Sequence, residues 1–235
     1  MKLIGIDDAG RGPIIGPMFL AGVLINQEKE KVLKDLGAKD SKLLTHLQRI
    51  KLAIEINKLA LATHIAESSP KEIDQAVETI NLNTLEAKKA AEIINKLNNP
   101  KEKIKIIVDC PSVNTVTWKK TLTNFITHPK NLDIYCEHKA DFNYPVVGAA
   151  SILAKCARER AVEIIKEQYG NTGSGYPSDP YTKAFLEKHK DTLKDSDIIR
   201  KSWATWKNLI GEPIKKKSKN KSPNRPRASG YQTQL

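Results

Sequence analysis

Residues 2–12 read KLIGIDDAGRG, an apolar run that ends in two aspartates and a glycine-rich turn. A second apolar run, PMFLAGVLIN, follows at residues 17–26. Two such runs around a Gly-rich turn predict a β-hairpin. The first strand of this hairpin therefore brings the carboxylates of Asp7 and Asp8 to its end.

The remaining chain alternates between strand and helix patterns. Residues 104–108 (IKIIV) are almost wholly apolar, which is typical of a central strand buried on both faces. This order predicts an α/β fold with a mixed central sheet flanked by helices. Further strands are predicted at 61–67 and 132–136, and helices at 45–60, from Ser69-Pro70, at 81–97, at 144–169, near 180–190 and at 198–210. Ser41 or Thr45 is placed to cap the helix of 45–60, and Ser69 the helix that follows it.

The chain of 235 residues is strongly basic, with a formal net charge of +12. Residues 213–235 hold five lysines, two arginines and no acid, so this segment alone contributes +7. A basic body with a more basic tail favours a polyanionic partner, nucleic acid ahead of an acidic membrane. The alternative is that the charge serves solubility. The Pro/Ser/Lys-rich composition beyond about residue 211 predicts a disordered tail.

The cysteines are Cys110, Cys136 and Cys156. They form no CxxC pair and no His-Cys cluster, so neither a zinc site nor a disulfide framework is expected. Free cysteines of this kind indicate a reducing compartment. The sequence starts without a signal-peptide pattern, and no apolar run approaches the roughly 20 residues of a membrane span. We therefore expect a cytoplasmic protein, or a nuclear one if the source has a nucleus, with no membrane association.

Acidic residues stand at the boundaries of the elements expected at the centre of the fold. Asp109 ends the run IKIIVD, and Asp141 opens the long helix in EHKADFNYPVVGAASILAK. Together with Asp7 and Asp8 they are expected to converge at one sheet edge, where mutually repelling carboxylates are usually neutralised by magnesium or manganese. Two ions about 3.5–4 Å apart would suit cleavage of a phosphodiester. Each acid also has a structural alternative: a turn residue for the first three, a helix cap for Asp141.

Several motifs resemble those of type 2 ribonucleases H, the ribonuclease HII family. The opening IGIDDAGRGPIIGPM is similar to that family's DEAGRGP signature. The resemblance continues, in the family's order, to about residue 206, and the EHKAD and YPVVGAASILAK segments resemble its archaeal and eukaryotic branch. The other matching segments are KDSK at 39–42, VDCPS at 108–112 and GSGYPSDP at 173–180.

This resemblance implies a ribonuclease H-like catalytic domain at 1–180, a helical extension at 181–211 and a basic tail at 212–235. It implies an endonuclease that hydrolyses the RNA strand of RNA–DNA hybrids. It further implies incision 5′ of a single ribonucleotide in duplex DNA, by two-metal-ion catalysis that leaves 3′-hydroxyl and 5′-phosphate ends. The implied cofactors are two Mg²⁺ or Mn²⁺ ions.

The resemblance also assigns residues. The implied metal-binding, catalytic acids are Asp7, Asp8, Asp109 and Asp141. Gly10, Arg11 and Gly12 match the turn whose backbone reads the ribose 2′-hydroxyl, which fits the close approach that glycine allows. Tyr176 matches the tyrosine that stacks on the sugar at the RNA–DNA junction. Lys42 matches a lysine near the substrate backbone, and Lys139, just before the fourth acid, is a further candidate for substrate binding. The alternative for each is a solvated surface lysine.

The second acid departs from the family pattern, because Asp8 stands where the family has glutamate. The carboxylate is one methylene shorter, so its reach can fall short by more than about 1 Å, a displacement that can cost about 100-fold in rate. Two rivals therefore stay open: a nucleic-acid-binding protein with a weakened or inactive metal site, and another two-metal nuclease of the same fold.

The C-terminal part raises two smaller hypotheses. Trp203 and Trp206, with Arg200, either contact a DNA strand or pack against the core. The terminal GYQTQL invites sliding-clamp binding, although the paired aromatics of that motif are absent. A monomer is the expected state.

Overall fold

Five strands form one mixed sheet in the order β3-β2-β1-β4-β5. The computed structural model describes residues 1–38 and 44–213 of the chain. β1 pairs antiparallel with β2, as the predicted hairpin requires, and parallel with β4. The strands are β1 (Lys2–Ala9), β2 (Met18–Asn26), β3 (Ala62–Ser68), β4 (Ile104–Asp109) and β5 (Leu132–Glu137).

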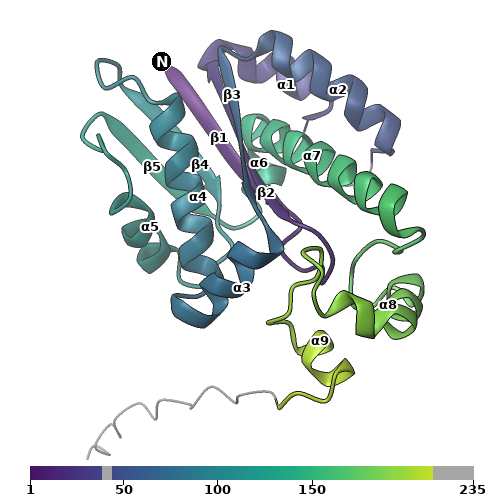
Figure 1. The fold of residues 1–235 in the computed structure, drawn as a ribbon. Helices are drawn as coiled ribbons and strands as arrows, with labels where there is room; N and C mark the ends of the chain where they lie inside the picture. The colour runs from purple at the N-terminus through teal and green to yellow at the C-terminus, as the bar shows by residue number, and fades with distance from the viewer. Residues whose placement is uncertain (39–43, 214–235) are drawn as a thin grey trace, which may run out of the picture.

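Helices cover both faces of this sheet (Figure 1). α7, α1 and α2 pack against one face, and α4, α5 and α3 against the other. The flanking helices are α1 (Glu30–Asp35), α2 (His46–Leu59), α3 (Pro70–Thr79), α4 (Leu82–Leu97), α5 (Thr115–Thr123) and α7 (Pro145–Tyr169). The remaining ones are the 3-10 turn η1 (Gln27–Lys29), α6 (Ala140–Asn143), α8 (Pro180–Leu193) and α9 (Ala204–Leu209).

Local capping signals explain where several helices begin. The Thr45 hydroxyl accepts the backbone N–H of Gln48 in a full capping box. The side chains of Ser69 and Asn81 are simple N-caps that accept the backbone N–H groups of Glu72 and Thr84. The predicted caps Thr45 and Ser69 are confirmed, and the alternative cap Ser41 lies outside the described residues.

Alternation along β1 divides the core between the two faces of the sheet. Leu3 packs on the α7 side, and Ile4 and Ile6 on the α4 side. Two glycines let one helix on each face come very close. A Cβ at Gly5 would stand 2.5 Å from the Val146 carbonyl of α7, and one at Gly22 would stand 2.2 Å from Ile93 of α4. The backbone of α7 therefore lies almost against that of β1, and the Ile93 side chain of α4 lies almost against the backbone of β2.

The C-terminal segment packs on the turn that follows β1. Ile14 and Ile15 share a hydrophobic cluster with Phe185 of α8, Trp206 of α9 and Ile165 of α7. Trp206 is buried, which supports packing for this residue rather than a DNA contact. The helix predicted at 198–210 is shorter than expected, because residues 198–200 instead form a bridge to the turn at Ile15. The division of the chain at 180/181 stays a prediction.

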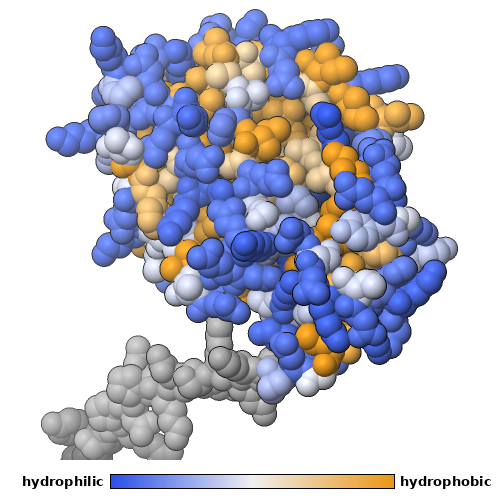
Figure 2. All heavy atoms as spheres, in the orientation of Figure 1, coloured by the Kyte–Doolittle hydropathy of each residue, from blue (hydrophilic) through white to orange (hydrophobic). Residues whose placement is uncertain are grey.

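The surface in the view of Figure 2 is mostly hydrophilic, with hydrophobic atoms gathered at its top. Exposed apolar side chains occur on α1 and α2, among them Leu47 and Ile54. None of the helices in the described residues combines the length and apolar character that a membrane span needs.

Candidate active site

Two of the predicted acids leave the sheet side by side. The parallel pairing of β1 with β4 ends at Ile6 and Val108, and Asp7 and Asp109 come next on their strands. Asp7 follows Leu3 at even spacing and Asp109 follows Ile107, so both acids lie on the face that α7 covers. Asp8 follows directly on β1, so its Cβ leaves the opposite face.

A left-handed turn brings Asp141 to the same place. Lys139 has φ 58° between β5 and α6, and the next backbone N–H, of Ala140, donates to Asp109 Oδ1 at 2.8 Å. Asp141 follows within α6 and is buried. The expectation that Asp141 opens the long helix is wrong. That helix, α7, starts at Pro145 with Tyr144 as its N-cap, so Asp141 belongs to a separate short helix.

Burial and mutual repulsion dominate the electrostatics of these acids. Burial raises the pKa of Asp7 well above its ordinary value, and the negative charges of Asp8 and Asp109 raise it further. A hydrogen bond with Ser151 of α7 opposes the rise in the pKa of Asp7. Burial also raises the pKa of Asp8 to about 6, against the lowering effect of Arg11. Such acids favour a positive charge between them.

The acids supply only carboxylate oxygens, the donor type that Mg²⁺ and Mn²⁺ prefer. However, no group of three or more His, Cys, Asp or Glu side chains is arranged to hold a metal ion in residues 1–38 and 44–213. The donor chemistry therefore fits a divalent cation, whereas the side-chain positions do not already enclose one. Metal binding at these acids stays a prediction.

A pocket of about 420 Å³ opens beside Asp8. It contains the predicted turn residues Gly10, Arg11 and Gly12 and the predicted Tyr176. Its remaining residues belong to no motif that predicts a role for them: Ala9, Arg49, Lys155, Arg158 and Glu159. Three of these five are cationic, so the pocket suits an anionic ligand.

Tyr176 stands at the wall of this pocket next to the turn. A Cβ atom at Gly12 would lie 3.3 Å from Cε1 of Tyr176, so the ring and the turn are in contact range. The guanidinium of Arg158 lies over the same ring, 5.0 Å from its centroid. Arg158 also donates to the carbonyl of Ser174 at 2.7 Å, which ties α7 to the loop before Tyr176.

The side chain of Arg11 is held by α4. Its guanidinium forms an ion pair with the buried Glu86 and donates to Asn83 Oδ1 at 2.7 Å. This pairing fixes the turn from one side. No local sequence pattern predicts this ion pair, because Glu86 resembles any other polar position of an amphipathic helix.

Arg200 contacts the turn from the other side and is fully buried. Its guanidinium donates to carbonyls of the turn, which rules out the direct DNA contact considered for it. Of the two predicted substrate lysines, Lys139 is exposed beside α6 and does not line the pocket. Lys42 lies outside the described residues.

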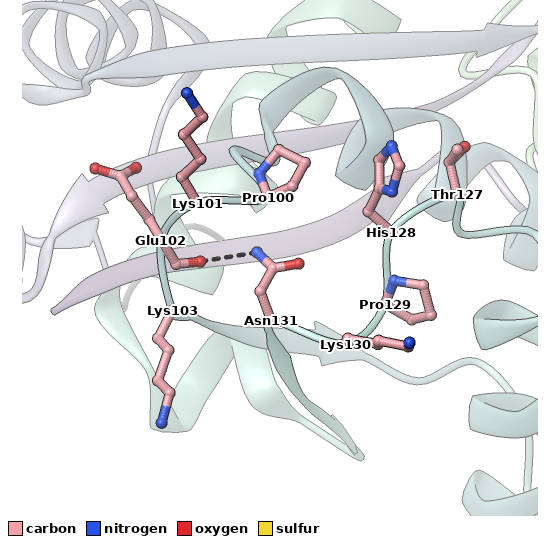
Figure 3. Close-up of a pocket in the computed structure, with 9 residues that line it drawn as sticks. All are labelled: Pro100, Lys101, Glu102, Lys103, Thr127, His128, Pro129, Lys130 and Asn131. Atoms are coloured by element: carbon pink, nitrogen blue, oxygen red, sulfur yellow. Dashed lines mark hydrogen bonds between the residues drawn. The ribbon is translucent and has the colours of Figure 1, made fainter.

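A second pocket, of about 570 Å³, lies at the opposite end of the sheet. It is formed by residues 100–103, which precede β4, and residues 127–131, which precede β5. Figure 3 shows Lys101 and Lys103 pointing in opposite directions around the Asn131 side chain, which donates to the Glu102 carbonyl at 2.8 Å. Its cationic groups diverge, so this hollow lacks the convergent chemistry of the pocket beside Asp8.

Comparison with known proteins gives consistent matches over most of the chain. A family model described as Ribonuclease HII matches residues 4–206. A ribonuclease HII of Methanococcus maripaludis strain C7 is 44% identical over 211 residues, which cover 89% of this chain and 87% of that protein.

Solved structures agree in fold. The ribonuclease H2 from Pyrococcus horikoshii OT3 superposes with a TM-score of 0.81 at 36% identity, covering 90% of this chain and 98% of that one. The ribonuclease HII in a PCNA complex from Archaeoglobus fulgidus gives a TM-score of 0.77 at 37% identity, covering 86% and 95%. A Bst ribonuclease HIII in complex with Mn²⁺, at 17% identity and a TM-score of 0.72, covers 90% and 70% and shows the fold alone.

Proposed function

The chain belongs to the ribonuclease HII family and is a type 2 ribonuclease H, and on that premise we propose how it selects and cuts its substrate. The family cleaves the RNA of RNA–DNA hybrids. We propose that this member also incises duplex DNA 5′ of a single ribonucleotide. The products are a 3′-hydroxyl and a 5′-phosphate.

The pocket beside Asp8 is the main support for this proposal. It joins a carboxylate, the turn Gly10-Arg11-Gly12 and the ring of Tyr176 in one hollow. The glycines leave room for a sugar to reach main-chain groups, and only RNA offers a 2′-hydroxyl there. Lys155 and Arg158 add positive charge for the phosphates on either side of that sugar.

The acids would hold the divalent cations that the reaction needs. Asp7 and Asp109 share one face of the sheet, and Asp141 follows the residue whose N–H donates to Asp109. Bound there, one or two Mg²⁺ or Mn²⁺ ions would activate a water and neutralise charge on the leaving oxygen. Mn²⁺ is the ion bound in the Bst ribonuclease HIII structure, which supports a test with both metals.

The chain's own residues then have separate tasks. The turn contacts the ribose, and Tyr176 stacks on the neighbouring sugar, so the scissile linkage stays beside Asp8. Arg158 covers the Tyr176 ring and restricts its motion. Lys155 donates to Ser151 Oγ at 2.9 Å, which places its charge between the acids and the pocket.

A catalytically weakened nucleic-acid-binding protein is the second candidate. It is favoured by the shorter acid at position 8 and by the absence, in the described part of the chain, of a ready-made metal-holding group. The third reading, another two-metal nuclease of this fold, loses its support because the family match covers residues 4–206.

Partners beyond the nucleic acid are also proposals. The Archaeoglobus relative was solved as a complex with PCNA, so a sliding clamp is a candidate partner here. The C-terminal segment considered for that contact lies outside the described residues. We keep the monomer and the cytoplasmic location as predictions.

One cleavage assay tests the proposal. The substrates are a duplex with a single ribonucleotide, an RNA–DNA hybrid and an all-DNA duplex, each with Mg²⁺, with Mn²⁺ or with EDTA. Asp109→Asn is the test variant. Asp133→Asn on β5 is the matched control, because Asp133 is exposed and lies near the start of its strand.

The proposal predicts incision 5′ of the ribonucleotide that EDTA and Asp109→Asn abolish and Asp133→Asn leaves unchanged. Tight binding without cutting in either metal would favour the second candidate. Equal cutting of the all-DNA duplex would refute ribonucleotide selection.

A further inference from the structure

Three consecutive carbonyls of the turn at Gly10-Arg11-Gly12 accept hydrogen bonds from one C-terminal segment. Arg200 Nη2 donates to Gly10 O at 2.6 Å, and Arg200 Nη1 donates to Arg11 O at 2.9 Å. Trp203 Nε1 donates to Gly12 O at 3.2 Å. We call Arg200 and Trp203 the carbonyl clamp.

The clamp is itself rigidly placed. Arg200 has 0% exposure, its Nε donates to Gly16 O at 2.9 Å, and its guanidinium stacks on the Trp203 ring at 5.1 Å. Asp74 of α3 accepts the backbone N–H groups of Lys201 and Ser202 at 2.7 and 2.8 Å. Burying a guanidinium is costly unless its donors are satisfied. Here the carbonyls of the turn satisfy them.

This arrangement decides which way the peptide groups of the turn point. In a trans peptide the C=O and the following N–H point in opposite directions. With their carbonyls held by the clamp, the peptides after Gly10 and Arg11 direct the N–H groups of Arg11 and Gly12 away from Arg200. Neither N–H has a protein acceptor among the described residues. Both residues line the pocket, so these donors are available to a ligand.

The positive charge of Arg200 also strengthens the N–H groups of the turn as hydrogen-bond donors. A hydrogen bond from a cationic donor is stronger than a neutral one, and it polarises the peptide that accepts it. The Arg11 and Gly12 N–H groups are therefore better donors than those of an ordinary exposed turn. Pro13 has no N–H, so the carbonyl of Gly12, held by Trp203, serves orientation alone.

We propose that Arg200 and Trp203 are positioning residues that set the discrimination of a ribonucleotide from a deoxyribonucleotide by orienting the turn's backbone donors. This inference rests on the proposed function of the turn as a ribose reader. It assigns the control of that reading to the C-terminal segment, about 190 residues away in the sequence.

The first test measures binding rather than cutting. Affinities for a duplex with one ribonucleotide and for the all-DNA duplex of the same sequence are compared in EDTA with the full chain. Their ratio does not depend on the folded fraction of a variant. The variants are Arg200→Met, Arg200→Lys and Trp203→Phe. Leu193→Ala is the matched control, because Leu193 is buried in the same cluster as Ile199 and its side chain has no hydrogen-bond donor for a carbonyl of the turn.

We expect Arg200→Met to lower the ribonucleotide preference by about 10-fold, the factor that corresponds to misaligning one or two backbone hydrogen bonds to the ribose. Arg200→Lys keeps the charge and should recover part of the preference. Trp203→Phe keeps the packing and removes one hydrogen bond, so its loss should be smaller and its fold intact. Leu193→Ala should lower stability and leave the preference unchanged.

Amide hydrogen exchange provides the second, independent readout. Without nucleic acid, Arg200→Met and Trp203→Phe should speed exchange in peptides covering residues 9–17 more than Leu193→Ala does. If the wild type shows no ribonucleotide preference, the proposed ribose reading fails, and exchange still decides whether the clamp orders the turn. An unchanged preference and unchanged exchange in Arg200→Met would overturn the clamp. An equal loss of preference in Leu193→Ala would overturn it as well.

Discussion

Gly12 lies against the ring of Tyr176, so that a Cβ atom at position 12 would stand 3.3 Å from Cε1 and 3.7 Å from Cδ1. The turn was expected to contact the ribose, and the ring was expected to stack on the sugar at the RNA–DNA junction. Because they are in contact, a larger side chain at position 12 would displace the Tyr176 ring.

A double-mutant cycle at these positions tests this coupling. Gly12→Ala should reduce kcat/KM about tenfold, because the ring must move by a few tenths of an ångström away from its place. In a Tyr176→Ala background the same substitution should cost far less, since residues in contact show non-additive effects. Strictly additive losses in steady-state cleavage would contradict a shared role.

The length of the acid at position 8 gives a second prediction. Asp8→Glu restores the reach of the carboxylate by one methylene and should raise kcat in Mg²⁺ by about 10- to 100-fold, the range associated with a displacement of about 1 Å. The gain should be smaller in Mn²⁺ if the wild type already works better with that ion. A fall in kcat would show that the surroundings are adapted to the shorter acid.

The raised pKa of Asp8 gives a third prediction, on stability. Its pKa in the folded chain, about 6, lies above the ordinary value of 3.8, chiefly because of burial. The folded state therefore holds the proton more tightly, and stability is lost as the pH rises from about 4 through about 6. Asp8→Asn removes the ionised form and should raise stability at pH 7.5 by about 1–3 kcal/mol.

Thermal melts in EDTA check this prediction. The gain corresponds to roughly 2–4 °C in Tm for each kcal/mol in a chain of this size. It should fall to about half at pH 5 and disappear near pH 3, where the carboxyl is protonated in both the folded and the unfolded chain, and Asp133→Asn should show no such pH dependence. The same rise in Tm at pH 7.5 and at pH 3 would argue against the buried, ionised carboxylate as its cause.

The pair between Arg11 and Glu86 gives a fourth prediction. Glu86 has a side-chain exposure of 1%, so Arg11→Ala leaves a buried carboxylate without its partner. We expect a loss of about 3 kcal/mol in the free energy of unfolding, and partial recovery when Glu86→Gln is added. Urea unfolding at pH 7.5 measures both.

The exposed pair of Lys2 and Glu102 serves as the control for this cycle. Their side chains are 30% and 37% exposed, and Lys2→Ala should cost less than about 1 kcal/mol. A double variant as unstable as Arg11→Ala alone would mean that the lost contact, rather than the unpaired charge, determines the cost.

Much of the fold follows from local patterns. The hairpin, the buried strand at 104–109 and the caps at Thr45 and Ser69 are encoded within a few residues of each element, so they could be predicted. The proximity of Asp7 and Asp109 follows from one further step, the parallel pairing of two strands that both end in acids.

The parts that were missed depend on contacts between distant residues. The hydrogen bond from Arg200 to Gly10 joins residues 190 positions apart, and the one from Arg11 to Asn83 joins residues 72 positions apart. No local sequence pattern predicts such contacts. The misplacement of Asp141 was avoidable. Tyr144 precedes Pro145 and is therefore disfavoured in a helical conformation, which separates α6 from α7.

Gly5 sets the distance between α7 and β1, and this distance does not depend on the side chains that α7 presents to the pocket. Because even a methyl group at Gly5 would stand 2.5 Å from the backbone of Val146, the depth at which α7 sits on β1 is set by main-chain contact. Lys155 and Arg158 lie about two and a half and about three turns further along the same helix. Substitutions of Lys155 can therefore be screened for altered substrate preference while the helix keeps its height, whereas Arg158 must be retained because it holds the loop before Tyr176.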